Sequence, residues 1–268
     1  MFTVIRHLLP LVCALIGATT WSAVVCASEK VDVDVRGKAL TLAIDQPAGQ
    51  SRGTIIMGSG DVGWVGLAVS MADSLSAQGY TVVGINVRQY LSAFTSGKSH
   101  LLVSDIPGDY RIVRDVLKQR RLLGHPVILS GVSEGAALAV LAAADAGNHD
   151  WVDGVITMGL PPTAELAWRW TDVGAWITKR DADEPAFAPK DVIAAVSPVP
   201  LFMIQSTKDE YVPKAEYDRL LTMAHEPKKL VLIDASNHRF TDKREELGAA
   251  YVSGLAWIAQ GANRGGRP

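Results

Sequence analysis

Cysteine is almost missing from this 268-residue sequence. Its two cysteines, Cys13 and Cys26, both fall in an apolar N-terminal segment, so the rest of the chain has none. This excludes a cysteine nucleophile, a thiolate metal site and a disulfide framework outside that segment. We therefore expect the domain to fold on its hydrophobic core alone, which a chain of this length with 48% hydrophobic residues can bury.

A surplus of positive charge is missing as well. The formal net charge is -2 at pH 7, and the basic cluster at 118–121 resembles the solvated face of a helix. Nucleic-acid binding requires a basic surface, so we expect no nucleic-acid partner. The sequence also has no internal repeat and no low-complexity tract, which favours one globular domain.

Residues 1–27 have the pattern of a secretory signal peptide. Arg6 precedes an apolar run at 8–25, and the segment ends in Val-Cys-Ala, which suits the positions that signal peptidase reads. An uncleaved membrane anchor is the alternative, although Pro10 weakens a spanning helix. We expect an exported protein, periplasmic or secreted, whose mature domain is 28–268.

A Gly-x-Ser-x-Gly pentapeptide is the most informative motif. Gly131 and Gly135 bracket Ser133 between an apolar run at 126–129 and an Ala- and Leu-rich segment at 136–146. This order predicts a strand, a sharp turn and a helix. The glycines are required because a side chain at either would strike the neighbouring strand or helix, and the turn strains the serine while exposing its hydroxyl. We predict that Ser133 is a nucleophile.

A serine needs a base and an orienting acid before it becomes nucleophilic. In domains with this turn the acid and then the histidine follow the serine, each after a strand. His238 comes just after the apolar run at 229–233, so it is the predicted base. Asp209 follows the run at 200–205 and is the predicted acid, with Glu210 as the nearest alternative.

Three glycines spell G-x-G-x-x-G between a predicted strand and a predicted helix: Gly58, Gly60 and Gly63. This is the dinucleotide-binding fingerprint, so an NADP-dependent reductase is an alternative. Against it, the next strand ends in Asn86 instead of an acidic residue, and the sequence has no Tyr-x-x-x-Lys pair. We favour a different use of the loop and expect neither a cofactor nor a metal ion.

The same loop follows the strand after which serine hydrolases place an oxyanion donor. We predict that the backbone N–H of Glu134 is one donor and that Ser59 or Asp61 supplies the other. If Gly58 is aligned with the usual glycine at the strand end, the donor is the Ser59 amide. If the loop is aligned with the Ser-Gly-Asp-Gly-Gly-Trp pattern, the donor is the Asp61 amide.

Strands alternate with helices along the chain, which predicts an α/β fold with a mostly parallel central sheet and helices on both faces. An antiparallel hairpin at 31–35 and 39–45 comes first. The tryptophan-containing region 161–197 has no strand pattern. It is either a small cap over the site or a pair of extra helices that pack on the core. The remaining expected strands are 53–57, 80–86, 126–129, 152–158, 200–205 and 229–233, and the expected helices are 65–78, 104–123, 136–146 and 243–259.

These motifs together resemble the α/β-hydrolase superfamily over 53–260, through the elbow GVSEG, the acid loop QSTKDEYVP and the histidine loop ASNHRF. Within it, GSGDVGW and VVGINVRQYL resemble the VirJ/AcvB family of virulence proteins, whose members are exported serine hydrolases. The family's usual Ser-Gly-Asp-Gly-Gly-Trp and Tyr-Ser-Phe-Gly patterns differ here at Val62, Val132 and Glu134. The resemblance implies hydrolysis of an aminoacyl ester on a phospholipid head group, with contact at the membrane surface.

We therefore expect an exported serine hydrolase that cleaves a carboxylic ester of a small molecule or lipid through an acyl-enzyme on Ser133. The alternative is a non-catalytic envelope accessory protein that keeps the fold and binds a partner. Three matched loops argue against this alternative, because a binding module has no need of them.

Overall fold

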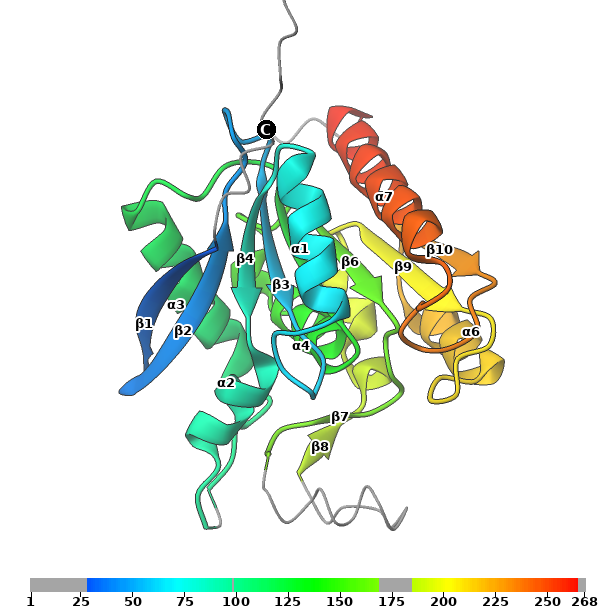
Figure 1. Cartoon of the computed structure of the whole chain (residues 1–268). Coiled ribbons are helices and arrows are strands. Elements are labelled where there is room, and N and C mark those ends of the chain that lie inside the picture. Colours follow the sequence, from blue (N-terminus) through cyan, green and yellow to red (C-terminus); the bar gives the residue numbers. More distant parts are fainter. Residues whose placement is uncertain (1–27, 98, 169–184, 265–268) are drawn as a thin grey trace, which may run out of the picture.

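The computed structural model describes residues 28–97, 99–168 and 185–264. The predicted signal peptide therefore lies outside the described residues. Eight strands form one sheet in the order β1-β2-β4-β3-β5-β6-β9-β10, with only β1 and β2 antiparallel to their neighbours (Figure 1). These strands are β1 (Glu29–Val35), β2 (Lys38–Asp45), β3 (Thr54–Gly58), β4 (Thr81–Ile85), β5 (Val127–Val132), β6 (Gly154–Met158), β9 (Leu201–Ser206) and β10 (Lys228–Ile233). The predicted mostly parallel sheet is confirmed.

Helices cover both faces of this sheet, as predicted. α1 and α7 pack on one face, and α2, α3, α4 and α6 pack on the other (Figure 1). Successive residues of the central strands serve the two cores in turn: Ile55 and Met57 face α1 and α7, whereas Ile56 faces the opposite layer. The helices are α1 (Leu67–Ala77), α2 (Val87–Phe94), α3 (Ile106–Gln119), α4 (Glu134–Ala143), α6 (Lys214–Met223) and α7 (Arg244–Arg264), with short 3₁₀ turns η1 (Ala146–Asn148), η2 (Pro189–Asp191) and η3 (Ile193–Val196).

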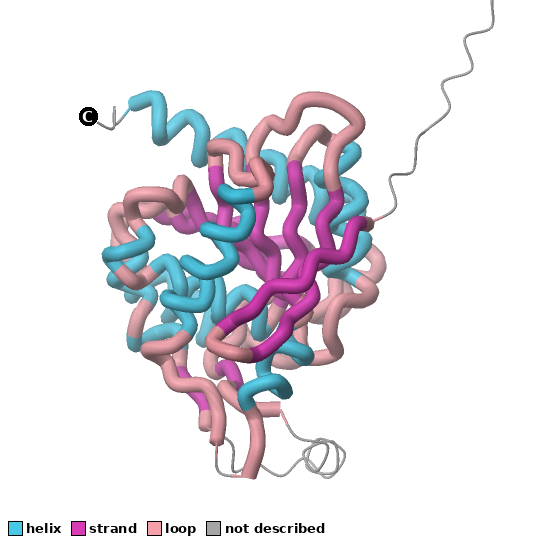
Figure 2. Tube along the Cα trace, turned by 90° about the vertical axis from the view of Figure 1, so that its left-hand side faces the viewer, coloured by secondary structure: helices cyan, strands magenta, loops and turns pink. Residues whose placement is uncertain are grey.

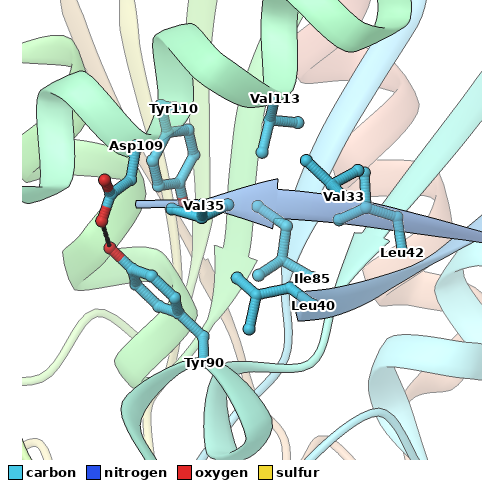
Figure 3. A pocket seen from close by; sticks show the side chains of 9 residues that line it. All are labelled: Val33, Val35, Leu40, Leu42, Ile85, Tyr90, Asp109, Tyr110 and Val113. Atoms are coloured by element: carbon cyan, nitrogen blue, oxygen red, sulfur yellow. Dashed lines mark hydrogen bonds between the residues drawn. The ribbon is translucent and has the colours of Figure 1, made fainter. Parts of the chain in front are cut away.

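The predicted hairpin is formed by β1 and β2, which cross in front of the rest of the sheet in Figure 2. Beneath it lies a small cavity of about 20 Å³, lined by nine residues of β1, β2, β4, α2 and α3 (Figure 3). Asp109 of α3 accepts hydrogen bonds from Arg36 in the hairpin turn, at 2.7 and 2.8 Å, and from the Tyr90 hydroxyl of α2, at 2.5 Å. One buried carboxylate thus ties the hairpin to two helices.

Helix α2 was not predicted from the sequence. The sequence pattern predicts that a strand ends at Asn86, but the Asn86 side chain accepts a hydrogen bond from the Gln89 N–H and caps the helix that begins at Val87. Asparagine is among the preferred residues at this capping position. The polar side chain after an apolar run was therefore a helix-start signal.

The region 161–197 contains two strands that were not expected, β7 (Ala164–Glu165) and β8 (Ala186–Phe187), which pair in an antiparallel ladder. The prediction of no strands was wrong because a two-residue strand is too short to show a sequence period. Both strands lie near the carboxyl ends of the parallel strands, at the bottom of Figure 1. The middle of the predicted cap, including Trp170 and Trp176, lies outside the described residues, so the cap stays a prediction.

None of the helices that the structure describes is both long enough and apolar enough to span a membrane.

Candidate active site

Ser133 occupies the turn between β5 and α4. Its backbone angles are φ 53° and ψ -119°, a region that residues with a side chain seldom adopt. Its N–H donates to the Met158 carbonyl at the end of β6, at 3.0 Å. The predicted strained turn between a strand and a helix is confirmed, and it is the kind of strain that functional sites retain.

Three glycines make this turn possible. A Cβ at Gly131 would lie 2.1 Å from the carbonyl carbon of Gly135, and a Cβ at Gly135 would lie 2.3 Å from the Gly58 carbonyl oxygen. A Cβ at Gly58 would in turn lie 2.7 Å from the Gly135 Cα. The first turn of α4 therefore sits directly on the backbones of β3 and β5. The predicted steric need for Gly131 and Gly135 is confirmed, and Gly58 shares it.

The predicted acid and base meet. His238 Nδ1 and Asp209 Oδ2 are 2.6 Å apart, and the two side chains are 8% and 0% exposed. The other carboxylate oxygen of Asp209 accepts from the N–H groups of Tyr211 and Val212, both at 2.9 Å. With the carboxylate fixed in this way and bonded to Nδ1, the imidazole keeps Nε2 for proton transfer.

Glu210, the alternative acid, has a different contact. Its carboxylate accepts from the backbone N–H of His238 at 2.7 Å. Glu210 therefore holds the histidine loop, while Asp209 pairs with the ring. Phe240 anchors the same loop, since its side chain is fully buried in the core beneath α7.

The His238 ring lies against Gly159, the residue that follows β6. Gly159 has φ 64°, and a Cβ there would lie 2.7 Å from His238 Cε1 and 3.1 Å from Nδ1. Because Ser133 bonds to Met158, the serine and the histidine border the same strand end. This role of Gly159 was missed from the sequence. A glycine directly after the strand next to the elbow strand was the available signal.

The charges around His238 raise its pKa above the ordinary value. Burial alone lowers the pKa, because it disfavours the charged ring. The hydrogen bond and charge of Asp209, followed by the charges of Glu134 and Glu210, outweigh burial. The surroundings therefore stabilise an imidazolium, the species that forms when the histidine takes a proton.

Ser59 does not fit the predicted role as an oxyanion donor. Its N–H already donates to the Ile85 carbonyl at 3.0 Å, because Ser59 extends the β3–β4 ladder by one residue. Its hydroxyl accepts from the Val87 N–H at 3.0 Å and donates to the Gly60 carbonyl at 2.9 Å, and its carbonyl accepts from the Gly135 N–H. Ser59 clamps the loop after β3 to its neighbours, so the prediction that it is the donor was wrong.

The next residues of this loop lie beside the serine. A Cβ at Gly60 would be 3.7 Å from the Ser133 Cβ, an ordinary contact distance. Asp61 follows, and its side chain accepts from the Val62 N–H at 2.9 Å. The amides of Asp61 and Glu134 stay the predicted pair of oxyanion donors.

Packing accounts for each glycine of the dinucleotide-like motif. Gly58 contacts Gly135 in the turn that holds Ser133, and Gly60 faces Ser133. Gly63 has φ 93° and lies against Asn86, whose Oδ1 would be 3.0 Å from an added Cβ. The described part of the chain also holds no group of three or more His, Cys, Asp or Glu side chains arranged to bind a metal ion.

Glu134 adds a second acidic group beside the serine. Burial raises the pKa of its carboxyl, and the nearby charge of Asp61 raises it further. Hydrogen bonds from its own N–H and from the Ser133 side chain, together with the charge of His238, act in the opposite direction. Within the described residues its Oε2 is buried and has no hydrogen-bond partner.

The chain is similar to known proteins both in sequence and in structure. The protein is 25% identical over 207 residues to the uncharacterized protein YfhR of Escherichia coli O157:H7, covering 75% of this chain and 69% of YfhR. Among solved structures, the esterase domain of a Rhodothermus marinus protein superposes with a TM-score of 0.60 at 18% identity, over 87% of this chain and 98% of that one.

Est1E from Butyrivibrio proteoclasticus gives a TM-score of 0.62 at 16% identity, over 87% of this chain and all of Est1E. An α/β serine hydrolase homologue from Coxiella burnetii gives 0.61 at 18% identity, over 86% and 99%. These likenesses establish the α/β-hydrolase fold that was predicted. The model of the family described as "Bacterial virulence protein (VirJ)" matches residues 53–255, and this chain therefore belongs to the VirJ family.

Proposed function

We propose that this protein is a serine hydrolase that cleaves a carboxylic ester through an acyl-enzyme on Ser133. One observation carries the proposal. The buried pair of Asp209 and His238, 2.6 Å apart, borders the same strand end as a serine held in a strained turn. The names of two structural neighbours, an esterase domain and a serine hydrolase homologue, point in the same direction.

In the first half-reaction His238 Nε2 takes the proton of the Ser133 hydroxyl while the oxygen attacks the ester carbonyl. Asp209 keeps Nδ1 protonated and stabilises the imidazolium. The negative charge on the former carbonyl oxygen is met by backbone amides, for which Glu134 and Asp61 are the candidates. The tetrahedral intermediate then loses the alcohol, which receives its proton from His238, and the acyl group stays on Ser133.

The second half-reaction repeats these steps with water. The oxygen of a water molecule attacks the acyl carbonyl while His238 takes a proton from that water. The carboxylic acid then leaves, and His238 returns a proton to the Ser133 oxygen. The proposal is that such an enzyme acts outside the cytoplasm, as the predicted signal peptide implies.

Steady-state hydrolysis of esters by the purified domain tests the proposal. We expect Ser133→Ala to reduce kcat by at least about 10³-fold while the circular dichroism spectrum and melting temperature stay close to wild type, because the hydroxyl contributes little to the core. Wild-type protein that is folded yet inactive on short-chain, long-chain and aminoacyl esters would instead favour the non-catalytic accessory protein.

A further inference from the structure

The last two residues of β9 are polar, although they lie in the interior of the protein. Gln205 and Ser206 follow four apolar residues of this strand, and both are 0% exposed. β9 lies between β6 and β10 in the sheet, and it leads into the loop that carries Asp209 (Figure 1). A buried polar side chain is unfavourable for folding unless it makes hydrogen bonds. The bonds of these two residues therefore indicate what they do.

The Gln205 side chain reaches the segment that follows β6. Its Nε2 donates to the Leu160 carbonyl at 3.0 Å. The N–H of Gly159 still bonds to a carbonyl of β9 at 3.0 Å, but two residues later Pro161 has no N–H with which to continue the ladder. The side-chain amide thus holds the backbone just beyond Gly159, and the His238 ring lies on that glycine.

The Ser206 side chain reaches the neighbour on the opposite side. Its hydroxyl donates to the Ala235 carbonyl at 3.0 Å and accepts from the Lys208 N–H at 3.3 Å. Ala235 is fully buried in the loop after β10 and comes three residues before His238, while Lys208 directly precedes Asp209. One hydroxyl therefore links the loop of the acid to the loop of the base.

The Gln205 amide has a cost that core packing does not explain. Its Oε1 is buried and has no hydrogen-bond partner among the described residues. An unpaired buried oxygen destabilises the folded state, and an apolar side chain of similar length would avoid it. The contribution that sets glutamine apart at this position is its bond to the backbone beside the His238 ring.

We propose that Gln205 and Ser206 are positioning residues, which together fix the two segments that hold the His238 ring. This inference rests on the proposed function and adds two residues to it. Asp209 bonds to Nδ1 and Gly159 lies against the ring, so the orientation of the ring depends on where the histidine loop and the segment after β6 lie. If either segment shifts, Nε2 moves relative to the nucleophile and proton transfer slows, while the binding of substrate is unaffected.

Two substitutions test the proposal. Gln205→Met keeps the length of the side chain and removes the donor, and Ser206→Ala removes the hydroxyl. For each variant we expect kcat on p-nitrophenyl butanoate to fall about 5- to 10-fold, with KM within about 2-fold of wild type. The rate of labelling by a fluorophosphonate probe should fall by a similar factor, because labelling also needs His238 to activate the serine.

Two matched controls separate positioning from a general loss of stability. Thr54→Val removes a fully buried hydroxyl that, like that of Ser206, donates to one backbone carbonyl and accepts from one N–H. These bonds hold the loop 122–124 at the amino ends of the parallel strands, far from the site. Thr157→Val removes a buried hydroxyl of β6 that has no partner in the described parts of the chain. We expect Thr54→Val to lower the melting temperature about as much as Ser206→Ala, and both controls to keep wild-type kcat.

Wild-type kcat in either Gln205→Met or Ser206→Ala would overturn the proposal, as would a loss that appears only in KM or an equal loss of kcat in Thr54→Val. Failure of the proposed function looks different: the wild-type protein neither hydrolyses the ester nor reacts with the probe at Ser133. In that case the positioning role falls with it.

Discussion

Gly159→Ala adds a methyl group against the His238 ring, and we expect it to slow the enzyme severely. The new Cβ would start 2.7 Å from His238 Cε1, whereas ordinary contacts begin at 3.4 Å, so the ring or the strand end has to shift by about 0.7 Å. A displacement of about 1 Å in a catalytic group can reduce the rate about 10²-fold. We therefore expect kcat to fall by roughly 30- to 100-fold with little change in KM.

The same substitution has a modest effect on stability. Alanine at φ 64° costs about 1–2 kcal/mol of unfolding free energy. Gly248→Ala is the matched control, because a Cβ at this position in α7 meets nothing within 4 Å and alanine favours a helix. Steady-state kinetics and urea unfolding of both variants provide the measurement. A folded Gly159→Ala enzyme with wild-type kcat would show that His238 does not act from its position on this glycine.

Three further predictions concern the base, the loop after β3 and the hairpin. His238 acts as a base only when its ring is neutral, and its pKa is raised. We therefore expect kcat/KM to rise with pH along an acid limb whose midpoint lies above about 6.5. A midpoint below about 6 would contradict the conclusion that the carboxylates around His238 outweigh its burial. Gly60→Val should lower kcat by roughly 10²–10³, because its branched side chain would crowd Ser133 and the oxyanion position. Gly60→Ala should have only a mild effect on kcat. Near-native kcat in a folded Gly60→Val enzyme would show that this loop does not supply an oxyanion donor. Asp109→Ala should lower the free energy of unfolding in urea by about 2–3 kcal/mol, because it leaves the buried Tyr90 hydroxyl without its acceptor and removes two hydrogen bonds of Arg36. We expect kcat of the folded enzyme to stay unchanged, and an unaltered urea midpoint would refute this prediction.

The fold was predictable because its signals are local. The apolar runs that became β5, β6 and β9 are buried along their whole length, and a glycine or a polar loop ends each of them. Helix α2 was missed because Asn86 can end a strand or begin a helix, and only its hydrogen bond to Gln89 decides between these. The two-residue strands β7 and β8 depend on each other's backbone and leave no pattern in the sequence.

The pairing of the site residues followed from chain order alone, since Asp209 and His238 each follow a strand at the same sheet edge. What could not be predicted depends on distances between segments far apart in sequence. Ser59 lost its predicted role because its amide continues the ladder to Ile85. Gly159 gained a role because the His238 ring, 79 positions later, lies on its backbone.

The acyl-enzyme on Ser133 is the central claim, and mapping a covalent adduct tests it most directly. Wild-type protein and Ser133→Ala are treated with a fluorophosphonate probe, digested and analysed by peptide mass spectrometry. Phosphonylation is expected on the peptide that contains Ser133, at one adduct per chain, and none is expected in Ser133→Ala. An adduct at another residue, or no adduct on a folded wild-type protein that contains the Asp209–His238 pair, would contradict the account.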